Sequence, residues 1–236
     1  MMAAGAEVWL AMAGVAGLCA GVGLRLAPWA REYDLRLRGG APATARTLWR
    51  AACHACHQPV YWGRDAWGAS VTGGLAAGVL AQQGWTGLAL LLLVLGLAAL
   101  AWLDGRSGLL PDALTLPLMV AGWWLGPLGP MGAFGASVAM WGALALAAGL
   151  YRCVRGLDGF GGGDVKCLAM LAGWLGWPAA LTILWGASVL GLLGWACRPG
   201  CRRRAYPFGP YLALATGPWI LWPETVGSWL ALLGGA

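Results

Sequence analysis

Eight long apolar segments divide this chain and restrict it to folds in which helices cross a lipid bilayer. A membrane-spanning helix needs roughly 20 predominantly apolar residues to cross a hydrocarbon core about 30 Å thick. Only 10% of the residues are charged, against about 25% in a typical soluble domain. The sequence therefore predicts an all-α, polytopic membrane protein with about eight transmembrane helices. The segments run approximately over residues 6–24, 66–82, 85–103, 112–126, 132–151, 164–177, 179–197 and 208–222.

The basic residues predict the orientation of these helices. If the eight segments alternate in direction, all 15 lysines and arginines fall on one face, and the opposite face keeps only Glu7 and Glu224. Short loops rich in lysine and arginine stay in the cytoplasm. We therefore expect both termini to lie outside the cytoplasm. The net charge of +6 is explained by this topology, so it does not indicate nucleic-acid binding.

Two acidic loops lie on the predicted cytoplasmic face. The first contains Asp104 and Asp112, and the second contains Asp158 and Asp164. Ionisable side chains at membrane depth are costly and are therefore functional candidates. Each aspartate also has a simpler explanation. Asp164 suits a helix N-cap, Asp112 suits a first-turn acid that complements the helix dipole, Asp104 suits an interfacial charge, and Asp158 suits a solvated loop acid.

We expect Asp104 and Asp164 to act together, because each lies at the end of an apolar segment on the same face. Two apposed carboxyl groups do not ionise together easily, so one keeps its proton while the other acts as a base toward water. The glycines at 161–163 would let the loop approach an extended peptide, since glycine has no Cβ. No serine or cysteine nucleophile with a paired histidine is evident. The alternative is a channel or transporter in which the two aspartates line an ion path.

Three motifs carry a family resemblance: "LDGRSGLLPDALTLP", "GFGGGDVKCLAMLAGWLGW" and "YPFGPYLALATG", in that order along the chain. They resemble the first aspartate loop, the GxGD motif and the late motif of bacterial type IV prepilin peptidases, which are polytopic aspartic proteases. The resemblance implies that Asp104 and Asp164 are catalytic and that Gly161 and Gly163 are the glycines of GxGD. Lys166 follows as in the family pattern.

The implied reaction is cleavage of the basic leader from type IV prepilins, or from pseudopilins of type II secretion, at the cytoplasmic face of the bacterial inner membrane. Proteolysis of this kind needs no cofactor. Many members of the family then methylate the new N-terminus with S-adenosylmethionine. The implied partners are the prepilin or pseudopilin substrate and the lipid bilayer. Asp112 and Asp158 are the candidates for acidic contacts with the basic leader.

The first cytoplasmic loop departs from the family pattern. That loop often holds two CxxC pairs that bind zinc, whereas this chain has only "CHACHQPV", with Cys53 and Cys56. A structural zinc site takes four ligands, and His54 and His57 are the nearest additional candidates. A zinc site and a vestigial cysteine pair are the two interpretations. The c-type haem attachment pattern also fits "CHACH", but the arginine-rich flanks place this loop in the cytoplasm.

The resemblance also divides the chain into four parts. Residues 1–24 form the first transmembrane helix, and residues 25–65 form a shortened cytoplasmic loop with a single CxxC. Residues 66–222 are expected to form the helical membrane peptidase domain. Residues 223–236 are expected to be a short extracytoplasmic tail.

Overall fold

The described part of the chain is helical throughout. The structure is a computed structural model that describes residues 2–55, 73–74, 87–156, 160–197, 207–222 and 224, with the backbone alone at 2–16, 27 and 88. No strand occurs in these ranges, which confirms the prediction of an all-α protein. The helices are α1 (Met2–Arg38), α2 (Ala45–Ala55), α4 (Gly87–Ser107), α5 (Asp112–Leu125), α6 (Gly129–Arg155), α7 (Gly162–Leu175), α8 (Trp177–Ala196) and α9 (Gly209–Leu221).

Within the described residues, three helices are long and apolar enough to cross a membrane, namely Ala89–Ser107, Gly129–Arg155 and Trp177–Ala196. The apolar helix Asp112–Leu125 is shorter. Seven of the eight apolar segments expected from the sequence overlap a helix, and the remaining segment, 66–82, lies mostly outside the described residues. The count of eight spans therefore stays a prediction.

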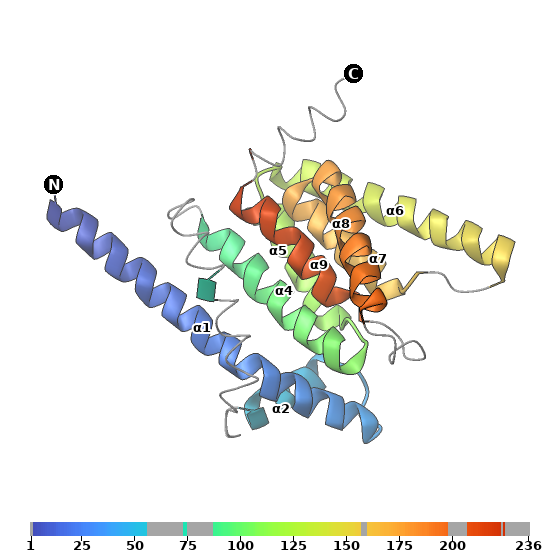
Figure 1. Cartoon of the computed structure of the whole chain (residues 1–236), viewed down its shortest axis with the longest axis horizontal. Helices are drawn as coiled ribbons and strands as arrows, with labels where there is room; N and C mark the ends of the chain where they lie inside the picture. Colours follow the sequence, from blue (N-terminus) through green and yellow to red (C-terminus); the bar gives the residue numbers. More distant parts are fainter. Residues whose placement is uncertain are drawn as a thin grey trace.

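The helices form a bundle with one long helix along its side (Figure 1). Helix α4 packs against α5 and α9, α7 packs against α5, α6 and α8, and α1 lies against α4. Helix α4 ends, and α5, α7 and α9 begin, at the end of the bundle nearest α2. This arrangement places the predicted acidic loops at a common end of the molecule.

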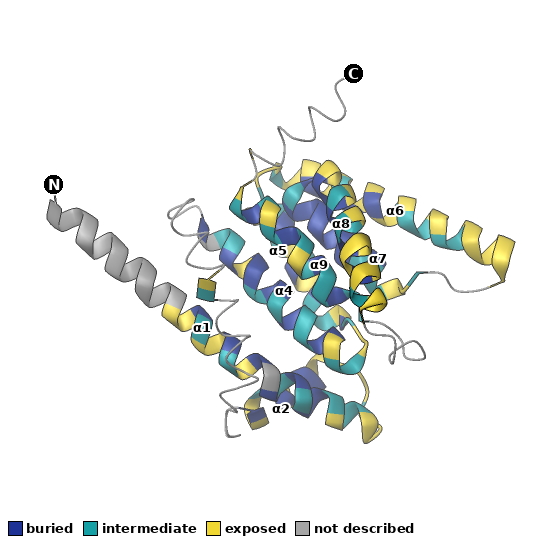
Figure 2. Cartoon of the chain, viewed as in Figure 1, coloured by how far each residue is buried: buried dark blue, intermediate teal, exposed yellow. Residues whose placement is uncertain are grey.

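The buried residues lie mainly on the helix faces that point into the bundle (Figure 2). The inner faces of α4, α7 and α9 are buried, whereas α6 leans away from the bundle and is exposed along much of its length. The exposed side chains of α6 include large apolar groups such as Leu146, Leu150 and Val154. In a bilayer such side chains face lipid tails, which are as apolar as leucine.

Small residues let the helices of the bundle approach each other closely. Trp174 of α7 is fully buried, and its Nε1 donates a hydrogen bond of 2.8 Å to the Leu118 carbonyl of α5. The indole ring lies against Gly122, where an added Cβ would come within 2.6 Å of the ring. Close approach over small residues is the usual way in which membrane helices associate, because water does not drive their apolar surfaces together.

A second apolar cluster joins α1 and α2 to the end of α4. Tyr33 of α1, Leu48 and Ala51 of α2, and Leu103 of α4 are buried together in it. The Trp29 indole donates a 3.1 Å hydrogen bond to the Leu48 carbonyl, which ties the two N-terminal helices together. The pair α1–α2 is thus packed against the turn of α4 that carries Asp104.

The tight contact at Gly122 predicts a stability difference between two glycine substitutions. Gly122→Ala is expected to lower the free energy of unfolding by about 1–3 kcal/mol, since overpacking displaces a fully buried ring. Gly135→Ala in α6 is the matched control, because nothing lies within 4 Å of its added Cβ. Thermal denaturation in detergent measures both. Equal midpoints for Gly122→Ala and the wild type would contradict the packing of α5 on α7.

Candidate active site

Asp104 lies in the last turn of α4 and is only 6% exposed. The sequence placed the end of this apolar segment at residue 103, but the helix continues to Ser107, so Asp104 is held inside it. Its Oδ2 accepts a 2.7 Å hydrogen bond from the backbone N–H of Gly209. Gly209 is the first residue of α9, and a helix N-terminus favours a negative charge. Asp104 is therefore a buried, specifically held carboxylate rather than a solvated interfacial charge.

Gly209 also leaves the space that Asp104 needs. A Cβ at position 209 would come within 2.9 Å of Asp104 Cβ and 3.0 Å of its Oδ2. Gly209 lies in the motif "YPFGPYLALATG", but the sequence analysis assigned it no role. The available signal was a glycine between prolines at the start of an apolar segment.

Asp164 lies in the first turn of α7, two residues after the helix begins. The N-cap is Gly161, whose extended backbone (φ −67°, ψ 128°) leads into the helix without a side-chain cap. The alternative that Asp164 is the N-cap is therefore wrong. Its carboxylate folds back toward the helix start, so that Oδ2 lies 2.7 Å from where a Cβ of residue 161 would be. The side chain is partly exposed.

The three consecutive glycines have different surroundings. A side chain at position 161 would force the Asp164 carboxylate to move, because a Cβ there would come within 2.7 Å of Asp164 Oδ2. A Cβ at Gly163 would come within 3.0 Å of Leu110 Cβ. Nothing lies within 4 Å of a Cβ added to Gly162. The two glycines of the GxGD pattern are thus the two that make close contacts within the chain. The sequence had assigned all three to leaving room for a substrate backbone.

The three motifs meet at this end of the bundle. Asp104 lies in the last turn of α4 and Asp164 in the first turn of α7, close enough for their charges to interact. The rings of Phe160 and Phe208 make an edge-to-face contact with centroids 6.5 Å apart. The glycine-rich loop thereby touches the late motif, while the late motif holds Asp104.

Lys166 and Asp112 join α7 to α5 beside this pair. Lys166 Nζ lies 2.8 Å from Asp112 Oδ1 and 2.6 Å from its Oδ2. Asp112 follows Pro111 as the first-turn acid of α5, as the sequence indicated. Both side chains are partly exposed, 39% for Lys166 and 52% for Asp112. Asp158, the other expected acidic contact, lies outside the described residues.

Of the cysteine pair Cys53 and Cys56, the structure describes only Cys53. Cys53 is exposed on α2, and His54 Nδ1 lies 3.7 Å from Glu32 Oε2. Cys56 and His57 lie outside the described residues. Within the described ranges, no group of three or more histidine, cysteine or acidic side chains is arranged to hold a metal ion. A zinc site at Cys53 and Cys56 stays a prediction.

The contact between Lys166 and Asp112 predicts a small, salt-dependent coupling. A double-mutant cycle with Asp112→Asn and Lys166→Gln is expected to give an attractive coupling of at most about 1 kcal/mol, since water screens an exposed pair. The coupling is expected to shrink as salt is added. Denaturation of the four proteins in mixed micelles measures it. A repulsive coupling, or one that grows with salt, would contradict the ion pair.

Residues 91–196, which include Asp104 and Asp164, match the type IV leader peptidase family. A prepilin leader peptidase/N-methyltransferase of Stutzerimonas stutzeri is 34% identical over 212 residues, which cover 83% of this chain and 71% of that protein. A protein of the same name from Dickeya chrysanthemi is 33% identical over 215 residues, covering 85% of this chain and 71% of that protein.

This chain covers a smaller share of two other relatives of the same name. The protein of Aeromonas hydrophila is 37% identical over 163 residues, which cover 66% of this chain and 56% of that protein. The chain spans 62% of the length of its relative from Burkholderia pseudomallei strain K96243. No solved structure matches the chain. The extent of identity and the aspartate-bearing region that it includes establish that the chain belongs to the type IV leader peptidase family.

Proposed function

We propose that this protein is an aspartic endopeptidase that removes the basic leader from type IV prepilins or type II secretion pseudopilins. The observation that carries the proposal is that Asp104, in the last turn of α4, and Asp164, in the first turn of α7, lie close enough for their charges to interact. Both helix ends lie at the same end of the bundle (Figure 1). Both residues lie within the region that matches the family. The names of the relatives describe leader peptidases, which gives the substrate class.

Two neighbouring carboxyl groups supply the acid and the base that peptide hydrolysis needs. The pair holds one proton in common, because two negative charges at short range repel each other. The ionised carboxylate takes a proton from water, and the water oxygen attacks the scissile carbonyl carbon. The protonated carboxyl group donates to the carbonyl oxygen. The C–N bond then breaks as a proton passes to the departing amine.

The surroundings of the two aspartates suit this chemistry. The Gly209 N–H fixes one oxygen of Asp104, so the carboxyl group is oriented before substrate arrives. Asp164 is partly exposed, whereas Asp104 is buried, so water and substrate would reach the pair from the Asp164 side. Asp112 is half exposed beside it. We assign Asp112 and Asp158 to the basic leader, whose cation would share the Asp112 carboxylate with Lys166.

The proposal also covers the location of the site in the membrane and a second reaction, N-methylation of the substrate. The positions of the basic residues support a site that faces the cytoplasm, with both termini outside the cytoplasm. The family implies the bacterial inner membrane. The relatives' names also include N-methyltransferase, for which S-adenosylmethionine is the methyl donor implied by the family. Mass spectrometry of the new substrate N-terminus, with and without that donor, measures methylation in the same assay.

Replacement of either aspartate is expected to abolish leader cleavage. With a prepilin in detergent, Asp104→Asn and Asp164→Asn are expected to lower the rate by about 10²–10⁴-fold, the usual contribution of a general acid or base. Asp34→Asn is the matched control, since Asp34 pairs with Arg38 on α1 and lies outside the site. If both site variants process the leader at the wild-type rate, the aspartates are not catalytic. Ion flux without proteolysis in proteoliposomes would instead favour a channel.

Substitutions at Gly161 and Gly162 distinguish two roles for the glycine triplet, namely placing the Asp164 carboxylate and admitting the substrate backbone. Gly161→Ala would displace the Asp164 carboxylate, and a misplacement of about 1 Å costs about 10²-fold in rate. Gly162→Ala meets open space and is expected to cleave at nearly the wild-type rate. Cleavage rates of the two variants, compared at equal thermal stability, decide between the explanations. If Gly162→Ala loses activity to the same degree, the glycines serve to admit the substrate backbone.

A further inference from the structure

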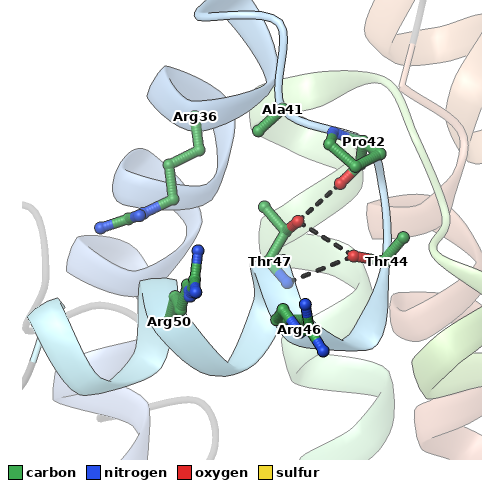
Figure 3. A pocket seen from close by; sticks show the side chains of 7 residues that line it. All are labelled: Arg36, Ala41, Pro42, Thr44, Arg46, Thr47 and Arg50. Carbon is green, nitrogen blue, oxygen red and sulfur yellow. Dashed lines mark hydrogen bonds between the residues drawn. The ribbon is translucent and has the colours of Figure 1, made fainter.

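A cavity of about 500 Å³ lies between the C-terminal end of α1 and the N-terminal end of α2, away from the two aspartates. Three arginines line it together with the turn of residues 41–44. Figure 3 shows Arg36 reaching in from α1, while Arg46 and Arg50 come from successive turns of α2. Positions 46 and 50 are four residues apart, so they share one face of the helix.

The positive charge in the cavity is only partly balanced. Arg36 Nη2 contacts Glu32 Oε1 at 2.7 Å, and Arg36 Nε is buried without a hydrogen-bond acceptor in the described part of the chain. Among the described residues, no acidic side chain pairs with Arg46 or Arg50. Arginine keeps its charge at every physiological pH, and like charges at this helical spacing repel each other. An anion in the cavity would relieve that repulsion.

The wall of the cavity adds a helix N-terminus to the arginines. Thr47 N–H approaches Thr44 Oγ1 at 3.4 Å, and Thr47 Oγ1 donates to the Pro42 carbonyl at 2.6 Å. These bonds hold the turn that leads into α2. The positive end of the α2 dipole therefore lies at the same cavity as the three guanidinium groups. Phosphate is the anion that such a combination suits best, because the planar guanidinium fork matches its oxygens.

The level of the cavity relative to the membrane favours a phosphate at the membrane surface. Leu48 and Ala51 of α2 pack with Leu103, which lies near the end of the apolar segment of α4, so α2 lies level with the point where α4 leaves the hydrocarbon. Trp49 is 72% exposed between the two arginines of α2. An exposed tryptophan beside arginines is typical of the headgroup region of a bilayer. Basic pockets on the cytoplasmic side of membrane helices bind anionic headgroups.

We propose that this arginine cavity is a binding site for a phosphate group, contributed by the headgroup of an anionic phospholipid or by soluble phosphate. Arg46 and Arg50 bind the phosphate oxygens from α2, and Arg36 completes the site from α1. The site is separate from the aspartate pair and does not depend on the proposed proteolysis. A bound phosphate would link the two helices whose cluster packs against the end of α4.

The test measures ligand binding to the full chain in a mild detergent. Short-chain phosphatidylglycerol, phosphatidylcholine and inorganic phosphate are the probes, with native mass spectrometry counting bound lipid and thermal midpoints reporting phosphate. The wild type is expected to prefer phosphatidylglycerol over phosphatidylcholine. The double variant Arg46→Gln/Arg50→Gln is expected to weaken binding about 30-fold, since each arginine at an anionic surface contributes a factor of about five.

The matched variants separate this site from general surface charge. Arg38→Gln is expected to bind as the wild type does, because Arg38 lies outside the cavity and its charge is paired with Asp34. The variant Arg46→Lys/Arg50→Lys keeps the charge but loses the planar fork, and is expected to bind with intermediate strength. Lipid binding that inorganic phosphate does not displace identifies the lipid as the source, and stabilisation by phosphate alone identifies the soluble ion. Unchanged binding in the double glutamine variant, or an equal loss in Arg38→Gln, overturns the proposal.

Discussion

The hydrogen bond from Gly209 N–H to Asp104 Oδ2 is the interaction on which the arrangement of the site depends. A carboxylate in the last turn of a membrane helix is doubly unfavourable, because it is buried and lies at the negative end of that helix's dipole. The N-terminus of α9 offsets both effects by supplying a donor and a positive partial charge. This requirement fixes where α9 begins relative to where α4 ends. It also requires glycine at the contact, since a side chain there would occupy the space of the carboxylate.

Asp164 also lies at a helix N-terminus, that of α7. Its carboxylate folds back over Gly161 at the start of α7, so each aspartate lies near the N-terminus of a helix and beside a glycine. Lys166, the only lysine in the sequence, lies two residues after Asp164 and is paired with Asp112. For Asp104, the stabilising group is a backbone N–H of α9, which carries no net charge.

The sequence predicted the all-α architecture and selected Asp104 and Asp164 as candidates, because apolar segment length and acidic residues at segment ends are local patterns. It could not predict the contacts that define the site, since these join positions about 50 to 105 residues apart. Gly209 on Asp104, Leu110 on Gly163 and Phe160 on Phe208 depend on how the helices cross. The extension of α4 past residue 103 was missed for a related reason. An aspartate usually ends an apolar segment, and only the tertiary contact with α9 makes its inclusion in the helix favourable.

The apolar cluster of α1, α2 and Leu103 joins the two N-terminal helices to the turn of α4 that carries Asp104. Leu103 immediately precedes Asp104 in α4 and is completely buried against the α1–α2 pair. The orientation of the last turn of α4 is therefore set from two sides, by α9 through a hydrogen bond and by α1 and α2 through apolar packing. The arginine cavity lies between the same two N-terminal helices. Because a ligand that bridges α1 and α2 restricts their relative motion, it would also restrict the surface against which the turn carrying Asp104 is packed.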